Sequence, residues 1–335
     1  MFILQVTLLI VVAYVFTFVN GVHDGGNVVA TIISSRSISP KKALVIAAIT
    51  EFISPLILGT AVAATIGKGI VKNEFIHSQG TQFALVFILC ALIGAIIWNL
   101  ITWWLGLPSS SSHALIGGLI GSGICAFGFQ SIDWVSFLFK VVLMIFLTPT
   151  LGFLIGILFM TYTNYLLKKC NPKINKILKS AQTFSMIFLA ASHSSNDAQK
   201  SMGIVTLILI TAGIQTQFYV PFWVKIISSF AIALGLYLGG WKIVKTVGRG
   251  IFKVKPMHSF VSQVSSASVI FASGLLGAPV STSQIVSSSI MGVGAGERVN
   301  AVRWIVVKSI FISWITTIPA AALISAVIYL IISLF

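Results

Sequence analysis

Two short polar stretches interrupt otherwise apolar sequence, and each carries an aspartate followed three residues later by a second polar side chain. NGVHDGGNVVAT, which begins at Asn20, contains Asp24 and Asn27, and ASHSSNDAQKSMGI contains Asp197 and Lys200. Residues at positions i and i+3 share one face of a helix. A charged group in an apolar segment is costly and persists where it has a partner or a task. If the fold brings them together, the two aspartates would therefore form a cation or proton site.

Two further stretches combine a proline, a run of hydroxyl side chains and an apolar segment. PSSSSHALIGGLIG begins at Pro108, and PVSTSQIVSSSIMG begins at Pro279. Proline is favoured in the first turn of a helix and serine or threonine at its cap, and the unpaired N–H groups of a helix start bind anions. The predicted oxyanion ligands are the hydroxyl residues after the two prolines, Ser109, Ser110, Ser111, Ser112, Ser281, Thr282 and Ser283.

Both kinds of motif recur in the same order after about 170 residues, as expected of the internal repeats found in secondary transporters. We expect a first transmembrane repeat at 1–166, a basic cytoplasmic linker at 167–180 and a second repeat at 181–335. Each half holds five apolar segments, so the second copy would enter the membrane from the opposite side. The segments at 108–128 and 279–296 could instead be re-entrant half-helices. The predicted fold class is an all-α membrane protein of two inverted-topology repeats with broken or re-entrant helices.

The composition is that of a protein embedded in a membrane. Of the 335 residues 57% are hydrophobic and only 8% are charged, and the mean hydropathy is +1.04. Soluble domains average about 25% charged residues. The apolar runs are long and continuous, which indicates helices, and helices satisfy the backbone in lipid. We expect a multi-pass protein of the cell membrane, with the lipid bilayer as a partner.

The net charge of +15 gathers in short loops, chiefly within 167–180 and 242–258. This is typical of loops on the cytoplasmic side, so no nucleic acid is expected as a partner. The three cysteines and five histidines lack the spacing of a metal site. No G-x-S-x-G sequence accompanies His113 and the serines before it. The chain is therefore predicted not to be an enzyme and to need no cofactor.

Taken together, these motifs resemble the inorganic phosphate transporter (PiT) family, in its bacterial or archaeal form. The resemblance covers nearly the whole chain and includes GWKIVKTVG besides the stretches quoted above. It implies secondary symport of inorganic phosphate with H⁺ or Na⁺ through a central site between the two repeats. The implied substrate residues are the hydroxyl residues named above with Asn27 and Asn196, and the implied coupling residues are Asp24 and Asp197. Lys200 and Glu51 are predicted as further coupling residues because both are charged groups in apolar segments. Na⁺ coupling would place the metal ion among Asp24, Asn27, Asn196 and Asp197.

Lys200 stands where the first repeat has Asn27, and its ammonium would occupy space and charge that Na⁺ could otherwise fill. We hypothesise that Lys200 favours H⁺ coupling, with Asp24 or Asp197 as the titrating group. A structural ion pair with Asp197 is the alternative for this lysine. Glu51 is interpreted either as a proton relay or support for the site, or as a structural residue. His193 is interpreted as a structural, hydrogen-bonded residue.

The nearest alternative function is symport of sulfate or another tetrahedral oxyanion. Phosphate near neutral pH can donate a hydrogen bond to a carboxylate and sulfate cannot, so Asp24 and Asp197 favour phosphate. An anion channel and an intramembrane enzyme are further alternatives, but buried acids in a broken-helix repeat favour coupled transport. We expect the repeats to rock about a fixed site, and self-association into homo-oligomers is left open.

Overall fold

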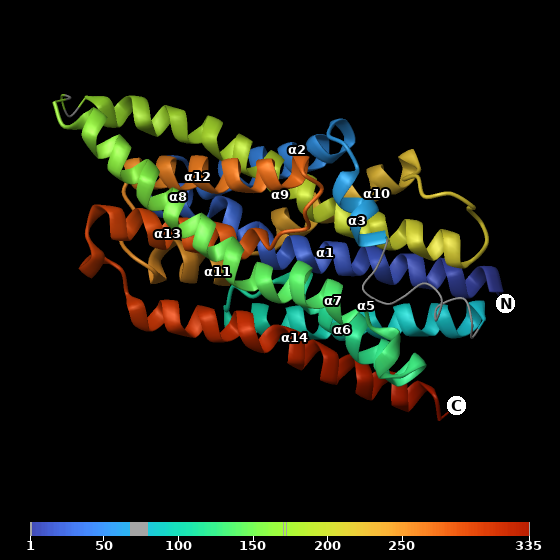
Figure 1. Ribbon diagram of the computed structural model, residues 1–335. Helices are drawn as coiled ribbons and strands as arrows, with labels where there is room; N and C mark the ends of the chain where they lie inside the picture. Colours follow the sequence, from blue (N-terminus) through green and yellow to red (C-terminus); the bar gives the residue numbers. More distant parts are fainter. Residues whose placement is uncertain (1, 68–79, 170, 172, 335) are drawn as a thin grey trace.

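Helices form nearly all of the structure, a computed structural model that describes residues 2–67, 80–169, 171 and 173–334 (Figure 1). No β-strand occurs among these residues. The first half contains α1 (Phe2–Ser34), α2 (Pro40–Ile57), α3 (Ala61–Gly67), α5 (Thr81–Leu105), α6 (Ser111–Phe127), η1 (Phe129–Ser131), α7 (Trp134–Phe137), the π-helical η2 (Leu138–Val142) and α8 (Leu143–Leu167). The second half contains α9 (Ile174–Thr211), α10 (Phe222–Leu238), α11 (Trp241–Lys245), the π-helical η3 (Thr246–Gly250), α12 (Pro256–Leu275), α13 (Thr282–Glu297), η4 (Val299–Ala301) and α14 (Trp304–Ile332).

The same order of elements occurs in both halves. A long first helix is followed by a shorter helix, a break, a hairpin of two helices, a 3-10 turn and a long final helix. Small details repeat as well. The indole of Trp134 donates to Phe129 O at 3.0 Å, and the indole of Trp304 donates to Val299 O at 3.2 Å. The structure therefore has the duplicated build that the recurring motifs predict.

Two separate clusters of buried apolar side chains lie on either side of a polar layer. The outer cluster includes Phe16 of α1 and Val205 of α9, and the inner cluster includes Val29 of α1 and Met186 of α9. Going along the chain, α1 passes from the outer to the inner cluster, whereas α9 passes from the inner to the outer one. The two helices that carry the aspartate motifs are thus antiparallel, as inverted repeats require.

Each hairpin contributes to one cluster, and this indicates that it enters and leaves on the same side. The buried apolar residues of α5 and α6 belong to the outer cluster, and those of α12 and α13 belong to the inner cluster. Thr102, near the end of α5, lies 3.1 Å from His23, whereas α1 continues from there to Ser34. Each hairpin therefore turns back within the bundle, an arrangement that agrees with the re-entrant alternative of the sequence analysis.

The repeats interlock instead of packing as two separate bodies. The final helix of each repeat lies against the hairpin of the other, α8 against α13 and α14 against α6. Glycines bring the backbones close together, since a Cβ at Gly292 would meet Phe153 O and one at Gly121 would meet Ala322 O. Because each final helix packs on the hairpin of the other repeat, a movement of one repeat must involve the other.

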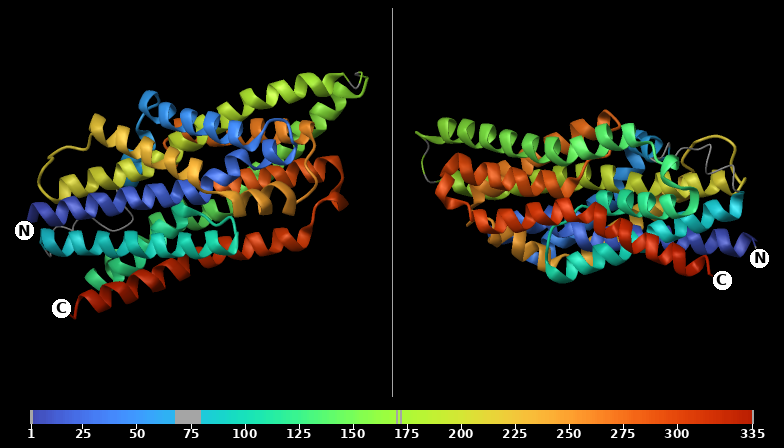
Figure 2. Two further views of the ribbon diagram at one scale, coloured as in Figure 1. Left: turned by 180° about the vertical axis from the view of Figure 1, so that it is seen from behind. Right: turned by 60° about the horizontal axis from the view of Figure 1, so that its bottom comes forward.

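The long helices have the dimensions of membrane spans. In the described part of the chain α1, α5, α8 and α14 are long and apolar enough to cross a bilayer, and α10 with α11 and η3 would form one more span bent by 58°. The 38 residues of α9 also exceed the length of a span, but its middle is polar. Both termini lie at one end of the bundle and the α8–α9 connection lies at the other (Figures 1 and 2). The basic residues of 167–180, which the sequence analysis predicts to be cytoplasmic, lie at that second end.

Candidate functional site

The two hydroxyl-rich stretches begin helices in the middle of the bundle. Ser110 caps α6 by accepting a hydrogen bond from His113 N at 3.3 Å, and Ser281 caps α13 by accepting one from Gln284 N at 3.4 Å. Both capping residues have extended backbones before the helix starts. The predicted helix starts are therefore present, and the first turns of α6 and α13 point into the polar layer between the two apolar clusters.

Each signature aspartate is joined to the first residue of a hairpin helix. Ser111 donates to Asp24 Oδ2 at 2.6 Å, and Thr282 donates to Asp197 Oδ2 at 3.0 Å. Asp24 is 2% exposed and Asp197 is 0% exposed. The structure thus brings the predicted coupling residues and the predicted oxyanion ligands into direct contact, once in each repeat.

Asp24 has a histidine as its second neighbour. His23 Nδ1 lies 2.9 Å from Asp24 Oδ1, and His23 Nε2 lies 3.1 Å from the hydroxyls of Thr102 and Ser109. A neutral imidazole satisfies this arrangement, since Nδ1–H donates to the carboxylate and Nε2 accepts from a hydroxyl. The sequence reasoning missed His23 and Thr102 as parts of the site, although His23 adjoins the aspartate.

Asp197 has a lysine where Asp24 has the uncharged Asn27. Lys200 Nζ donates to Asp197 Oδ1 at 2.5 Å, to Ser112 Oγ at 2.5 Å and to Val280 O at 3.0 Å. Lys200 is 2% exposed. Its ammonium therefore bridges the starts of both hairpins, and all three of its N–H groups have acceptors.

A second acid reaches the same cluster from α2. His193 Nδ1 lies 2.7 Å from Glu51 Oε1, and its Nε2 lies 3.3 Å from Asp197 Oδ2, which is an ion-pair distance without hydrogen-bond geometry. Both His193 and Glu51 are 0% exposed. His193 is hydrogen-bonded, as predicted, but it also connects two of the predicted coupling residues. Its position one helical turn before Asp197 was the available signal.

The two asparagines of the predicted site differ in how many of their amide atoms are hydrogen-bonded. Asn27 is 1% exposed, and neither amide atom has a hydrogen-bond partner. Asn196 Nδ2 donates to Ala278 O at 3.2 Å, and its Oδ1 has no partner. A buried amide without partners is costly, so the polar layer holds unused donors and acceptors beside Asp24.

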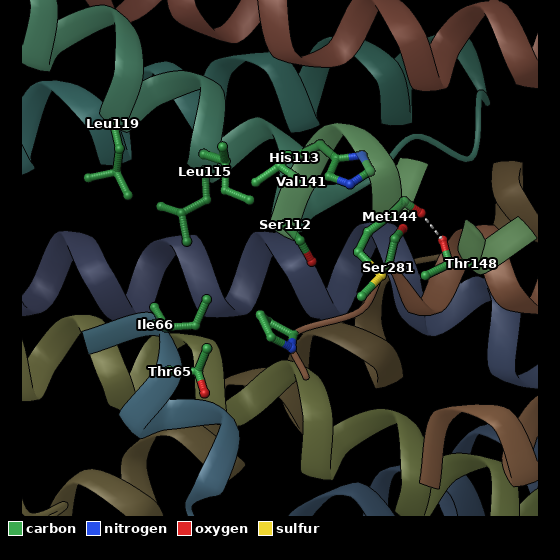
Figure 3. A pocket seen from close by; sticks show the side chains of 12 residues that line it. Thr65, Ile66, Ser112, His113, Leu115, Leu119, Val141, Met144, Thr148 and Ser281 are labelled. Atoms are coloured by element: carbon green, nitrogen blue, oxygen red, sulfur yellow. Dashed lines mark hydrogen bonds between the residues drawn. The ribbon is translucent and has the colours of Figure 1, made fainter. Parts of the chain in front are cut away.

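A cavity of about 50 Å³ starts at the hairpin ends and runs into the outer cluster (Figure 3). Its polar end is formed by Ser112, His113, Thr148 and Ser281, and its apolar walls come from α3, α6, η2 and α8. Figure 3 places the side chains of Ser112 and Ser281 on facing sides of the space. The cavity therefore connects both rows of hydroxyl residues with the outer half of the bundle.

A tryptophan fills the equivalent position on the inner side. Counted from Trp134 and Trp304, Met144 of α8 corresponds to Trp314 of α14. Met144 lines the cavity, whereas Trp314 is 2% exposed within the inner cluster and donates its indole N–H to Pro108 O at 2.9 Å. The hairpin α5–α6 is thus held by a hydrogen bond on the side of the inner cluster.

The fold and the polar layer together define a membrane protein of inverted repeats with a buried polar layer, which is the build of secondary transporters. The chain matches the phosphate transporter family over residues 20–173 and 167–325. It is 43% identical to a probable low-affinity inorganic phosphate transporter of Rhizobium meliloti (strain 1021), with 96% of this chain and 94% of that protein covered. A protein of Bacillus subtilis (strain 168) with the same description is 39% identical over 99% of this chain and 98% of its own length.

A solved structure, described as the sodium-dependent phosphate transporter, has the same fold with a TM-score of 0.87 and 25% identity, and 99% of each chain is covered. The chain therefore belongs to the phosphate transporter family, as the resemblance of its motifs predicted. Its relatives are transporters and not enzymes. The family match covers both halves of the chain, in agreement with a duplicated membrane unit.

Proposed function

We propose that this protein is a symporter that imports inorganic phosphate together with H⁺ or Na⁺. The observation that carries the proposal is the matched pair of hydrogen bonds from Ser111 to Asp24 and from Thr282 to Asp197. An anion held at the hairpin starts and a cation or proton held at the aspartates would share these residues as neighbours. Binding of one would then depend on binding of the other.

In this proposal, phosphate lies between the starts of α6 and α13. The open N–H groups of the two first turns and the nearby hydroxyls would donate to its oxygens. Asn27 would add its amide group, which has no partner now, and Asn196 would add an amide whose oxygen has no partner. Phosphate is preferred over sulfate because a protonated phosphate can donate a hydrogen bond to the carboxylate of Asp197, whereas sulfate has no proton to donate. The ligands proposed for the anion are Ser109, Ser110, Ser111, Ser112, Ser281, Thr282, Ser283, Asn27 and Asn196.

Coupling follows from electrostatic repulsion. Two unit charges of the same sign about 4 Å apart repel by about 4 kcal/mol at an effective dielectric constant of about 20. Phosphate would therefore bind poorly beside an uncompensated carboxylate. A proton on Asp24, or a Na⁺ ion between Asp24 and Asn27, removes this repulsion and admits the anion.

The two repeats do not carry the same charge. Glu51 and Asp197 flank His193, and Lys200 pairs with Asp197. An imidazolium at His193 would leave these four residues with no net charge. Asp24, by contrast, is hydrogen-bonded to His23 and Ser111 and, among the described residues, forms no ion pair with a lysine or arginine. We therefore propose that Asp24 is the exchangeable coupling group, that it takes up a proton, and that Lys200 replaces a cation in the second repeat.

The interlocked helices limit how alternating access can occur. Residues 1–166 and 181–335 are not free to rock as two rigid bodies, because α8 packs on α13 and α14 packs on α6. We propose instead that each moving body combines a hairpin with the final helix of the other repeat. The central residues would then face the outer and inner sides in turn.

The test is uptake of labelled phosphate into proteoliposomes that contain the purified protein, with Na⁺ and pH gradients imposed separately. Asp24→Asn and Asp197→Asn are compared with Glu297→Gln, which removes a partly exposed acid outside the polar layer. Unlabelled sulfate is included as a competitor. We expect an inward H⁺ gradient to drive uptake, Asp24→Asn to abolish this dependence, and Glu297→Gln to behave like the unaltered protein.

Each contrary result removes a different part of the proposal. Uptake that follows Na⁺ and ignores pH would leave a phosphate symporter but refute the proton at Asp24. Sulfate accumulation without phosphate uptake would change the substrate. Gradient-independent flux in the unaltered protein would refute symport altogether.

A further inference from the structure

A second cavity, far from the central site, lies at the cytoplasmic end of the bundle. It has a volume of about 610 Å³, within the range of about 300–1,000 Å³ that is common for small-molecule sites. It is bounded by the end of α1, by η3 and the segment after it, and by the start of α14. Ten residues line this cytoplasmic basic pocket: Ser34, Ser35, Arg36, Gly248, Arg249, Lys253, Val254, Lys255, Pro256 and Arg303.

Half of the lining residues are basic, and they come from three separate parts of the chain. Arg36 follows α1 and Arg303 precedes α14. Arg249 belongs to η3, and Lys253 and Lys255 lie between η3 and α12. None of the five forms an ion pair with an acid in the described residues, where Glu297 pairs with His258 at 3.8 Å. The chain has only six acids. The pocket therefore concentrates positive charge that the protein itself does not neutralise.

The general preference for basic residues on the cytoplasmic side explains why these five residues are positively charged. It does not explain why they meet in one pocket. Lys176 and Lys179 at the start of α9 lie on the same side and do not line the pocket. Arg36 has φ 56°, and it is the only residue other than glycine with positive φ in the described part of the chain. Such a backbone is uncommon outside glycine and often occurs at functional sites. The fold thus holds Arg36 in a strained position beside the other four bases.

Two further features suit an anion with oxygen atoms. The hydroxyl of Ser34 is buried at the pocket and has no hydrogen-bond partner. Gly248 packs against the end of α1, and the ideal Cβ of an alanine there would meet Ser34 Oγ and Ala30 O. Arginine forks bind phosphate oxygens in pairs. A single phosphate would leave most of the five cations unpaired, whereas several linked phosphate groups would engage them together.

We propose that the cytoplasmic basic pocket binds an anion that carries two or more phosphate groups. The ligand would be either a free oligophosphate or nucleotide of the cytoplasm or the headgroup of a phosphorylated lipid, because both present the same chemistry. This site is separate from the central polar layer and does not depend on the transport reaction proposed above.

The test is binding of tripolyphosphate and of inorganic phosphate to the full-length protein in nanodiscs of zwitterionic lipid, measured by calorimetry. The double variant Arg249→Gln/Arg303→Gln removes two cations of the pocket, and Lys176→Gln/Lys179→Gln removes two exposed cations elsewhere on the same face. Arg36→Gly removes a third cation while relieving the strained backbone, so it keeps the fold. Thermal unfolding checks that every variant is folded.

We expect tripolyphosphate to bind more tightly than phosphate, and the pocket variants to bind it about tenfold more weakly because charge-assisted contacts are lost. The lysine control should bind it as the unaltered protein does. Equal losses in both double variants, or no binding to the unaltered protein, would overturn the proposal. Repeating the titration in nanodiscs that contain anionic lipid distinguishes the two sources. If a lipid headgroup occupies the pocket, it competes and tripolyphosphate binds more weakly. If the ligand is a free anion, the binding of tripolyphosphate is unchanged.

Discussion

Trp314 offers the sharpest test of how the two sides of the transporter are closed. Its indole N–H donates to Pro108 O at the start of the first hairpin, at 2.9 Å, within the inner cluster. Trp314→Phe removes this donor but keeps an aromatic ring beside Phe311, whose ring centroid is 6.0 Å away. The bond joins α14 to a hairpin of the other repeat. We therefore expect it to hold the cytoplasmic side closed.

The size of the effect follows from the lost hydrogen bond. A buried hydrogen bond contributes about 0.5–1.5 kcal/mol net, and the unpaired carbonyl of Pro108 adds to the loss. If the bond exists only in the closed arrangement, Trp314→Phe should shift the equilibrium by about 1–2 kcal/mol, which is a factor of about 5–30. The inward-open population should rise by this factor.

Chemical labelling from the cytoplasmic side measures this population. Ser287 corresponds to Ile116 of the cavity and is fully buried in α13. In a background without Cys90, Cys125 and Cys170, a Ser287→Cys variant is exposed to a membrane-impermeant maleimide in inside-out vesicles. Trp314→Phe should raise the labelling rate by about 5–30-fold.

Trp304→Phe is the matched control, because Trp304 makes a similar bond to Val299 O but is 46% exposed at the edge of the bundle. It should leave the labelling rate unchanged. Equal rates in Trp314→Phe and the unaltered protein would refute the idea that this bond closes the inner side. Equal increases in both tryptophan variants would show a general loosening of α14 instead.

Three further perturbations test packing and charge. Lys200→Asn should give phosphate uptake a steeper dependence on Na⁺, because it recreates the Asn27 arrangement in the second repeat; Na⁺-independent uptake would contradict the role given to this lysine. Glu51→Gln should lower both the thermal unfolding temperature and uptake, since breaking a buried charge pair costs about 3–5 kcal/mol, and unchanged uptake would make Glu51 dispensable. Gly21→Ala should destabilise the protein by about 1–3 kcal/mol in thermal unfolding because the new Cβ would meet Ile232 O. Gly274→Ala, where a Cβ meets nothing within 4 Å, should leave stability unchanged or raise it, and similar losses in both glycine variants would contradict the packing argument.

Local patterns were sufficient to predict the helices, the duplication and the helix starts. The long apolar runs are readable as helices because lipid imposes the same chemistry along the whole of a span. Ser110 and Ser281 were predictable as caps because a cap depends on contacts within one turn. The repeated aspartate and hydroxyl motifs can be recognised in the sequence without knowledge of how the helices pack.

The central contacts needed the tertiary structure because they join residues that are distant along the chain. Glu51 and His193 come from different repeats, and neither residue identifies the other in the sequence. Lys200 was expected beside Asp197, but its bonds to Ser112 and Val280 depend on where the two hairpins meet. Only the packing decides which donor reaches which acceptor.

The sequence by itself determined that the chain is a helical membrane protein of two inverted repeats, since hydropathy and repeated motifs are properties of the chain alone. The depth of each hairpin, the exchange of α8 and α14, and the convergence of Arg36, Arg249 and Arg303 were decided by the tertiary structure. An apolar segment has the same composition whether it crosses the membrane or turns back within it. Its course depends on the helices against which it packs.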